Sequence, residues 1–483
     1  MRDRLALVSL VLACSPREHA IETSSSLALE DCHVKGSSRP ARCGVLERPE
    51  DPGVPSSRAV PLRVVVIPAK TGARHAPLYF LAGGPGQGAS EAFAPLLPLF
   101  EELGEHRDFV LVDQRGTGSS GPLRCDADDE SLPERLETEV DTAKLTACLA
   151  GFDADTTRYL TTIAIDDLDA VRAALGHDRI DLYGGSYGTR AALVYARQYP
   201  QHVGKLVLDG VAPVDMAMPL SFARDAQAAL DQTFADCGAE PTCAAAFPGA
   251  ADAFAKWFAT LPRAEQGSST TVAVIDPRTG ESEQVKVTRE LVGSSIRGIL
   301  YSPALAAMLP YVLHRAEAGE PSPLFALSLA IGESAEKSMA EGMLFSVVCS
   351  EDVPFLDDAT IARETAGTFL GDTVVGIFRD ACSVWTKTEL PAGYREPVTS
   401  SAPTLVLSGA LDPVTPPRWG EHVLAHLADG RHVVVPGAGH GTVQVECVRG
   451  IVAAFLDGVE LDTSCVAEQH RPPFFVDFAG PPA

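Results

Sequence analysis

The residues Gly184-Gly185-Ser186-Tyr187-Gly188 have the types and the spacing of a serine nucleophile on a sharp turn. In the pattern Gly-x-Ser-x-Gly, the serine connects a strand to a helix and has strained backbone angles. The residues two before and two after the serine must be small, because the strand and the helix pass close together there. The pattern predicts that Ser186 attacks an electrophilic centre. A chance match in a chain rich in Gly and Ser is the alternative.

The sequence on either side of Ser186 supports this prediction. Residues Arg179–Tyr183 form a short β-prone run, and Thr189–Tyr199 favour a helix that ends before Pro200. A strand, a turn and a helix in this order are what a nucleophile elbow requires. A glycine-rich β-α loop without chemistry is the alternative.

A serine nucleophile needs a general base. His440 lies in a glycine-rich loop directly after the β-prone run His432–Val435. The carboxyl ends of strands are where open α/β sheets place their active sites. The other histidines of this region differ, since His432 begins the run, and His422 and His426 lie on a predicted helix. We therefore predict that His440 is the base.

The base in turn needs a carboxylate that orients its ring. Asp412 lies in the loop after the β-prone run Leu405–Leu407, and it precedes His440 in the chain order Ser, Asp, His. Asp209, at the end of the earlier run Leu206–Leu208, is the alternative acid. We predict that Asp412 has this role.

Acyl transfer also needs two backbone N–H groups that face the developing negative charge. One is predicted at Tyr187, directly after the nucleophile, and the other in the loop Ala82–Gly86. Pro85 has no N–H, so Gly84 is the predicted second donor. A tight turn that needs glycine for positive φ is compatible with this role.

A sheet must position these residues. Apolar β-prone runs recur from Cys43 onward and alternate with helical stretches, including Ile163–Leu175 and Thr189–Tyr199. Such runs indicate a largely parallel sheet that is covered by helices on both faces. The eight predicted strands are Cys43–Leu46, Leu62–Ile67, Leu78–Leu81, Phe109–Val112, Ile180–Tyr183, Leu206–Leu208, Leu405–Leu407 and His432–Val435.

A long insertion interrupts this pattern between residues 214 and 400. It contains a predicted helix, Ala251–Leu261, and a predicted β-hairpin of Thr271–Ile275 and Gln284–Thr288. The rest of the insertion is predicted to be mainly helical. An insertion at this place favours a lid that restricts access to the site and excludes water. A purely structural subdomain is the alternative.

The N-terminus predicts export. Arg2 and Arg4 give a basic start, Leu5–Ala13 is apolar, and Cys14 follows. The apolar stretch is too short to span a bilayer as a mature helix. Val11–Cys14 resembles a bacterial lipobox, in which the cysteine is lipidated. Ordinary signal cleavage nearby is the alternative.

The predicted organisation therefore has six parts. They are the export signal with its candidate lipobox (1–14), a polar, Ser-rich tether (15–40), the first part of the core (41–213), the lid or cap insertion (214–400), the C-terminal part of the core (401–466) and an irregular, proline-containing tail (467–483).

Ten cysteines remain once Cys14 is set aside, and they fall in neighbouring couples. An exported protein keeps such couples as disulfides. Metal binding, the alternative, favours a Cys-x-x-Cys spacing, which the sequence lacks. Local pairing is predicted for Cys32 with Cys43, Cys125 with Cys148, Cys237 with Cys243, Cys349 with Cys382, and Cys447 with Cys465.

The net charge of −25 argues against nucleic acid and anionic membrane surfaces as partners, because both repel acidic proteins. It favours a cationic substrate, such as a peptide with a free amine, although solubility alone explains the charge equally well. A membrane is expected only through the candidate lipid anchor at Cys14. No metal and no organic cofactor is implied.

Three motifs occur together in the first half of the chain: Gly83–Gly86 (Gly-Gly-Pro-Gly), Asp113–Ser119 (Asp-Gln-Arg-Gly-Thr-Gly-Ser) and the Gly184–Thr189 segment. They resemble the prolyl iminopeptidase and tripeptidyl aminopeptidase family of α/β hydrolases. The late segments Leu411–Pro416 and Gly437–Gly441 resemble the TAP-like C-terminal region of secreted tripeptidyl-type members. The resemblance covers about residues 43–465 and implies an α/β-hydrolase fold, with an eight-stranded, mostly parallel sheet, helices on both faces and a large helical lid.

The resemblance implies an exported aminopeptidase that releases prolyl or di- or tripeptidyl units from peptides with a free N-terminus. Ser186 would attack the scissile carbonyl, His440 would take its proton and give it to the leaving amine, and Asp412 would orient His440. Water would then hydrolyse the acyl-enzyme. The chain departs from the family at Ala82, where a His usually precedes Gly-Gly-Pro-Gly. The backbone donors remain, but strict prolyl iminopeptidase activity becomes less favoured.

An aminopeptidase also needs an anion that holds the ammonium group of its substrate. The segment Cys349–Asp352 resembles an acidic segment of the tripeptidyl-type enzymes, and Glu351 is its predicted ligand. A solvated surface carboxylate is the alternative.

Two further functions remain open at this point. One is a carboxylesterase or another acyl hydrolase with the same triad, because fold alone does not determine the substrate. The other is a non-catalytic, lipid-anchored binding protein, against which the complete set of Ser, Asp and His argues.

Overall fold

The computed structural model describes residues 27–125, 131–267, 270–276 and 278–481. The predicted export signal and the candidate lipidation site Cys14 lie outside the described residues, as does the first part of the predicted tether.

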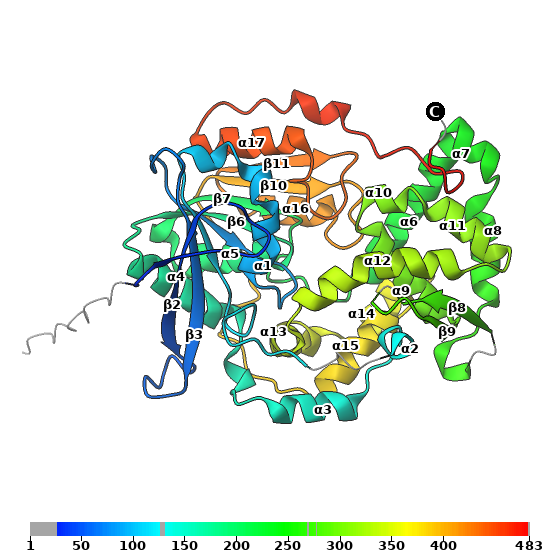
Figure 1. The fold of residues 1–483 in the computed structure, drawn as a ribbon, viewed down its shortest axis with the longest axis horizontal. Helices are drawn as coiled ribbons and strands as arrows, with labels where there is room; N and C mark the ends of the chain where they lie inside the picture. The colour runs from blue at the N-terminus through cyan, green and yellow to red at the C-terminus, as the bar shows by residue number, and fades with distance from the viewer. Residues whose placement is uncertain (1–26, 126–130, 268–269, 277, 482–483) are drawn as a thin grey trace, which may run out of the picture.

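A nine-stranded sheet forms the centre of the molecule, with the strand order β1-β2-β3-β5-β4-β6-β7-β10-β11 (Figure 1). From β5 to β11 neighbouring strands run parallel, whereas β1–β2, β2–β3 and β3–β5 pair antiparallel. All eight predicted strands are present, as β2 (Ala41–Pro49), β3 (Ala59–Ile67), β4 (Leu78–Leu81), β5 (Phe109–Val112), β6 (Ile180–Gly185), β7 (Val203–Asp209), β10 (Thr404–Gly409) and β11 (Gly430–Val435).

The predicted count of eight strands is one short. The additional strand, β1 (Glu30–Cys32), pairs with β2 at the edge of the sheet, within the segment that the sequence predicts as a tether. It is short and mostly exposed, so it lacks the apolar run by which the other strands were predicted. The disulfide between Cys32 and Cys43 joins it to β2.

Helices cover both faces of the sheet, and successive residues of one strand pack on opposite faces. Leu182 belongs to the hydrophobic cluster shared with α4 (Thr161–Ala174), α5 (Tyr187–Gln198) and α16 (Pro417–Leu424). Its neighbour Tyr183 belongs to the cluster shared with α1 (Ala89–Phe93) and α17 (Glu446–Asp457). Because both faces are buried there, central strands such as β4 and β5 are continuously apolar instead of alternating.

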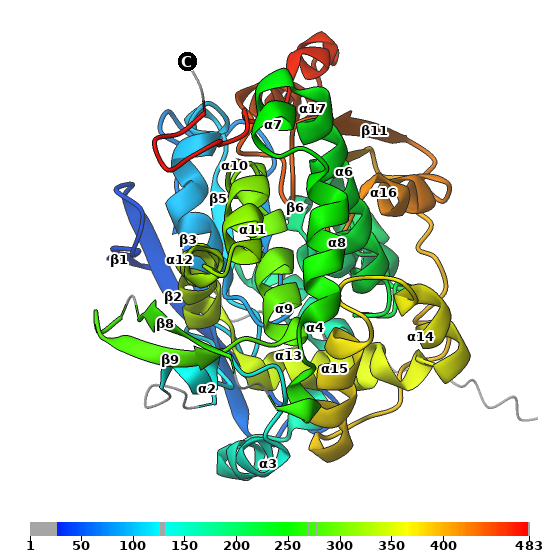
Figure 2. The same cartoon turned by 90° about the vertical axis from the view of Figure 1, so that its right-hand side faces the viewer.

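The predicted insertion forms a mainly helical subdomain beside the sheet, here called the lid for its position, and in Figure 2 it lies in front of the strands. The predicted hairpin is present as β8 (Thr271–Ile275) and β9 (Ser282–Lys286). The helices are α6 (Phe222–Ala239), α7 (Pro241–Ala246), α8 (Ala250–Thr260), α9 (Arg289–Leu300), α10 (Pro303–Ala306), α11 (Leu309–Glu317), α12 (Ser322–Ser338), α13 (Glu341–Glu351), α14 (Asp358–Thr365) and α15 (Thr373–Val384). This part has a hydrophobic core of its own, which includes Val292 and Phe325.

Two segments outside the predicted insertion of residues 214–400 also pack into the lid core. The helix α2 (Leu132–Arg135) follows β5, and its Leu132 is buried in the lid core. The C-terminal tail crosses from α17 to the lid, as the red segment in Figure 1 shows, and buries Phe474 in the same core. Phe475 N–H donates to the carbonyl of Ala307 at 3.1 Å. Residues 469–481 contain no helix but are packed against the lid.

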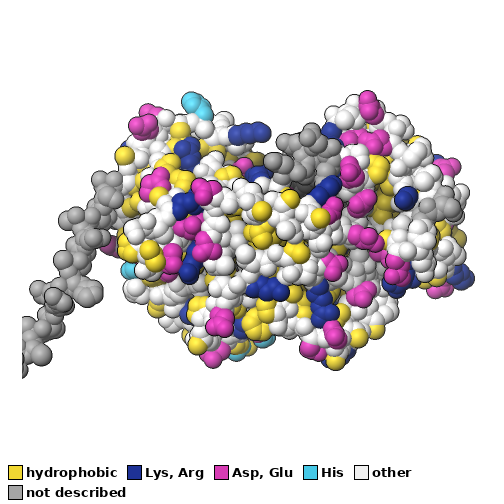
Figure 3. Space-filling model, turned by 90° about the horizontal axis from the view of Figure 1, so that it is seen from below, with side chains coloured by type: hydrophobic (Ala, Val, Ile, Leu, Met, Phe, Trp, Pro, Cys, Tyr) yellow, Lys and Arg dark blue, Asp and Glu magenta, His cyan; other side chains and the backbone are white. Residues whose placement is uncertain are grey.

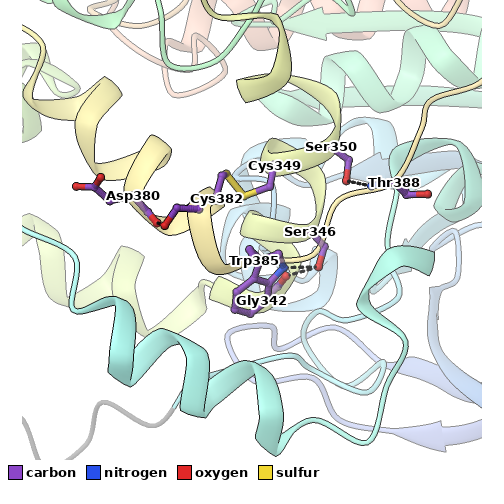
Figure 4. Close-up of a disulfide and its surroundings, with 9 residues drawn as sticks. Gly342, Ser346, Cys349, Ser350, Asp380, Cys382, Trp385 and Thr388 are labelled. Carbon is purple, nitrogen blue, oxygen red and sulfur yellow. Dashed lines mark hydrogen bonds between the residues drawn. A yellow bond between two sulfur atoms is a disulfide. The ribbon is translucent and has the colours of Figure 1, made fainter.

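All five predicted disulfides are formed: Cys32–Cys43, Cys125–Cys148, Cys237–Cys243, Cys349–Cys382 and Cys447–Cys465. Cys349–Cys382 joins α13 to α15 inside the lid (Figure 4). Beside it, Trp385 Nε1 donates a hydrogen bond of 3.1 Å to Ser346 Oγ. Five disulfides indicate a protein that folds in an oxidising, extracellular compartment.

The surface carries charges of both signs. On the face seen in Figure 3, Asp and Glu side chains lie interspersed with Lys and Arg and with single apolar side chains. Within the described ranges, no helix is both long enough and apolar enough to cross a membrane.

Candidate active site

Ser186 lies between β6 and α5 in a strained conformation, with φ 55° and ψ −124°. Among the described residues it is the one non-glycine residue with positive φ. Such strain persists only where the surrounding structure enforces it, and it is concentrated at functional sites.

The two flanking glycines of the motif are required by close backbone contacts. A Cβ atom at Gly184 would lie 2.4 Å from the carbonyl oxygen of Gly188, and a Cβ at Gly188 would lie 2.0 Å from that of Leu81. At Gly185 the nearest atom would be 3.9 Å away, so that position has room for a side chain. The motif therefore has the physical basis that the sequence predicts.

Neighbouring segments hold the turn. The N–H of Ser186 donates to the carbonyl of Asp209 at 2.9 Å, which ties the turn to the end of β7. Thr189 Oγ1 donates to the carbonyl of Ser186 at 2.6 Å and accepts from the N–H of Ala212 at 2.8 Å. Thr189 thus links the first turn of α5 to the segment after β7.

His440 and Asp412 form a pair. His440 Nδ1 lies 2.9 Å from Asp412 Oδ2, and the Asp412 side chain is 0% exposed. Because an ionised carboxylate only accepts, Nδ1 carries the proton and Nε2 is left as the basic nitrogen. This is the arrangement that a general base beside a serine requires.

Thr415, which the sequence prediction missed, contacts both members of this pair. Its Oγ1 lies 2.7 Å from Asp412 Oδ2 and 3.1 Å from His440 Nδ1. Val414 N–H and Thr415 N–H donate to Asp412 Oδ1 at 2.8 and 2.9 Å. The Asp-Pro-Val-Thr spacing is typical of an Asx-type turn, and it is the signal by which Thr415 could have been found.

The electrostatics of the pair favour its charged form. Burial opposes ionisation of Asp412, but the charge of His440 and hydrogen bonds from His440 and Thr415 hold the pKa of Asp412 below its usual value. Burial likewise opposes protonation of His440, but Asp412 and, less strongly, Asp209 raise the pKa of His440 above its usual value. A protonated His440 is thereby stabilised.

Asp209, the alternative acid, does not bond to His440. Its carboxylate accepts from Tyr183 Oη at 2.7 Å, from Thr442 N–H at 2.9 Å and from Thr442 Oγ1 at 3.0 Å. Burial raises the pKa of Asp209. The contacts of Asp209 hold the loop that carries His440, while Asp412 makes the bond to the ring.

Ser186 and His440 line one cavity of about 530 Å³. Its volume lies within the range of small-molecule and peptide sites, roughly 300–1,000 Å³. The wall of this cavity therefore carries both the hydroxyl of Ser186, on its strained turn, and the imidazole of His440, which is paired with Asp412. The other lining side chains include Gln87, Glu91 and Gln444.

The loop after β4 lies directly against Ser186. A Cβ atom at Gly83 would be 3.2 Å from Ser186 Cβ, and Gly84 has φ +106°. The lid contacts this loop, since Ala340 N–H donates to the carbonyl of Gly86 at 2.9 Å. Tyr187 begins α5 directly after Ser186. Gly84 and Tyr187 are thus on segments adjacent to Ser186, where their predicted role as donors requires them.

Glu351 is fully buried and is not one of the residues that line this cavity. Thr161 N–H donates to its Oε1, and Thr161 Oγ1 donates to its Oε2, each at 2.8 Å. Tyr394 Oη also donates to Oε2, and Arg190 Nη1 lies 3.7 Å from it. The alternative of a solvated surface carboxylate is therefore wrong. The predicted amine-binding role also has no support in this position, because Glu351 does not line the cavity and both of its oxygens accept hydrogen bonds from protein groups.

The sequence could not place Glu351 because its partners come from α4, α5 and the segment after α15, all distant in the chain. Within the part of the chain that the structure describes, no group of three or more His, Cys, Asp or Glu side chains is disposed to hold a metal ion.

Two family matches agree with this architecture. Residues 76–238 match the family described as "alpha/beta hydrolase fold", and residues 368–465 match the family described as "TAP-like protein". The first range contains β4 to β7 with Ser186, and the second contains β10 and β11 with Asp412 and His440.

Several proteins are similar to the chain. The serine protease Hip1 of Mycobacterium tuberculosis is 27% identical over 462 residues, covering 86% of this chain and 85% of that protein. A tripeptidyl aminopeptidase of Streptomyces lividans is 28% identical over 203 residues, covering 38% and 37%. A proline iminopeptidase of Xylella fastidiosa is 30% identical over 135 residues, covering 28% and 32%.

Proposed function

Since the chain belongs to the α/β-hydrolase superfamily and has a TAP-like C-terminal region, we propose that it is an exported serine aminopeptidase that releases prolyl, dipeptidyl or tripeptidyl units. The observation that carries the proposal is the hydrogen bond between His440 and Asp412, since His440 lines one cavity with Ser186 on its strained turn. The peptidase names of three similar proteins support a peptide as the substrate.

In the proposed reaction, Ser186 Oγ attacks the scissile carbonyl while His440 Nε2 takes the hydroxyl proton. The negative charge on the former carbonyl oxygen is stabilised by the N–H groups of Gly84 and Tyr187. His440 then protonates the leaving amine, and the peptide bond breaks to give an acyl-enzyme. Water, deprotonated by His440, attacks the ester carbon, and Ser186 leaves with the proton that His440 returns.

Contacts in the structure support the roles proposed for Asp412, Ser186 and Gly84. Asp412 keeps the His440 proton on Nδ1, so Nε2 accepts from Ser186. Ser186 follows β6 and lines the cavity at the carboxyl edge of the parallel strands, where α/β sheets place their sites. The lid contact at Gly86 holds the loop that carries Gly84.

Export is proposed from residues 1–14 together with the five disulfides. We propose Cys14 as the lipid attachment site. In a bacterial host that lipidates proteins, wild-type protein should incorporate a labelled fatty acid and fractionate with the envelope. The Cys14→Ala variant should lose the label. Equal labelling of both proteins would reject Cys14.

A fluorophosphonate probe and a substrate panel test the proposed chemistry. The probe should label wild-type protein and should not label Ser186→Ala, whose melting temperature should be unchanged. The panel contains prolyl, alanyl and tripeptidyl anilides with free amines, their N-acetylated versions and short acyl esters. We expect turnover of the free-amine anilides. Turnover of the esters alone would show an acyl hydrolase instead, and absence of labelling would support a binding protein.

A further inference from the structure

The proposed function requires a group that binds the positively charged N-terminus of a peptide, and this inference rests on that function. Two carboxylates line the cavity that Ser186 and His440 share, Asp209 and Glu91. Asp209 is buried and accepts hydrogen bonds from Tyr183, Thr442 and Val443. The oxygens of Asp209 hold the structure of the site, whereas Glu91 is exposed and pairs through one oxygen with Arg124, so Glu91 is the carboxylate that a substrate can reach.

Glu91 is exposed and is positioned by the same segment that approaches Ser186. It lies in α1, which follows directly after the glycine loop 83–86. Its side chain is 40% exposed, and its Oε2 lies 3.0 Å from Arg124 Nη2. A carboxylate has about four lone-pair sites, so an ion pair through one oxygen leaves room for a second cation.

The remaining polar side chains around the cavity are mostly neutral. Gln87, Ser338 and Gln444 line it with Glu91, and Gln87 Nε2 donates to Ser338 Oγ at 3.2 Å. These groups can bind peptide N–H and C=O groups but cannot neutralise an ammonium. Glu91 is therefore the group on this wall with the charge that a free N-terminus requires.

We propose that Glu91 binds the N-terminal ammonium group of the peptide substrate. A peptide would then be fixed at two points, its amine at Glu91 and its scissile carbonyl at Ser186. The separation between these two points determines how many residues are released. A blocked N-terminus loses the charge-assisted hydrogen bond and leaves the Glu91 carboxylate without that partner.

Glu91→Gln tests the proposal, because it removes the charge and keeps the size and the hydrogen-bonding oxygen. We expect KM for a free-amine tripeptidyl anilide to rise about tenfold, with kcat little changed, and KM for the N-acetylated anilide to stay the same. Glu91→Lys should raise KM for the free amine further, because it places a like charge at the site. Both variants should melt at the wild-type temperature.

Glu105→Gln is the matched control. Glu105 is 42% exposed and pairs with Lys70 at 2.9 Å, much as Glu91 pairs with Arg124, but it does not line the cavity. Glu105→Gln should leave KM unchanged for both the free-amine anilide and the N-acetylated anilide. If Glu91→Gln and Glu91→Lys keep the wild-type preference for free amines, the proposal for Glu91 is overturned while the aminopeptidase function stands. If wild-type protein cleaves no free-amine peptide, both are overturned.

Discussion

The carboxylate of Asp209 accepts a hydrogen bond from the N–H of Thr442 at 2.9 Å, two residues beyond His440. The carbonyl of the same Asp209 accepts from the N–H of Ser186. One residue at the end of β7 therefore ties together the turn that carries the proposed nucleophile and the loop that carries the proposed base. The side chain of Asp209 holds the His440 loop, and its carbonyl holds the Ser186 turn. A change of the side chain therefore tests the contact with the His440 loop alone.

Asp209→Asn should lower kcat about tenfold, because an amide replaces one oxygen that holds the His440 loop. Asp209 also raises the pKa of His440, and neutral His440 is the active base. Loss of its charge should lower that pKa, so the acid limb of the kcat/KM profile should move to lower pH. Unchanged kcat and an unchanged limb would show that Asp209 has no part in positioning.

Asp412→Asn should also move the acid limb of the kcat/KM profile to lower pH, and it should lower kcat more than Asp209→Asn does. It removes the largest influence that raises the pKa of His440 and removes the acceptor that sets its tautomer. The loss in kcat should be about 10³- to 10⁴-fold, as for other serine triads. A pH–rate profile of both variants with the same substrate shows which substitution lowers kcat more. A larger loss in Asp209→Asn would reverse our assignment of the acid.

Gly188→Ala should destabilise the protein, whereas Gly185→Ala should leave its stability nearly unchanged. The new methyl group at position 188 would lie 2.0 Å from the carbonyl oxygen of Leu81, a backbone atom that cannot move alone. Overpacking of this kind costs about 1–3 kcal/mol. At position 185 the nearest atom is 3.9 Å away. Thermal melting of the two variants measures the contrast, and equal melting temperatures would contradict it.

Glu351→Gln should reduce stability and leave KM for free-amine peptides unchanged. Its carboxylate is fully buried, accepts from Thr161 and Tyr394, and lies near Arg190. Removal of one charge from a buried network leaves Arg190 less compensated, and we expect a loss of about 1–3 kcal/mol. Denaturant unfolding and steady-state kinetics check both parts. A rise in KM confined to free amines, with stability unchanged, would restore an amine-binding role for Glu351.

Loss of the Cys349–Cys382 disulfide should destabilise the lid more than loss of Cys237–Cys243. The sequence separations are 33 and 6 residues, and a longer loop restricts the unfolded chain more. The loop-entropy relation gives about 4 kcal/mol for the first and about 2 kcal/mol for the second. Paired Cys→Ala variants of each bridge, unfolded in urea, test the order. Equal losses would point to strain or residual structure in the unfolded lid.

Much of the fold and of the proposed triad follows from local patterns in the sequence. The glycines around Ser186 are required by contacts a few residues apart or across one neighbouring strand, so their spacing is visible in the chain. The central strands are apolar because both faces of the sheet are covered. Asp412 and His440 each follow such a strand, and the parallel direction of β10 and β11 brings them together. Neighbouring cysteines pair because short loops close readily.

Only the tertiary structure decided which polar side chains face the cavity. Glu351 carries an acidic signal in the sequence but is buried by Thr161, Arg190 and Tyr394, which come from three distant segments. Glu91 carries no motif, yet it lines the cavity beside Ser186. Burial of a charged group depends on partners that the fold brings together, and no local period or spacing encodes those partners.

The same reason separates the features that the sequence determined from those that the tertiary structure decided. The sequence by itself determined the sheet, the strained turn at Ser186 and the order of Ser, Asp and His, because backbone sterics and strand burial act over short stretches. The tertiary structure decided that β1 joins the sheet, that α2 and Phe474 belong to the lid, and that Asp209 holds the His440 loop. Those contacts join residues far apart in the chain, where only the packed molecule defines the neighbours.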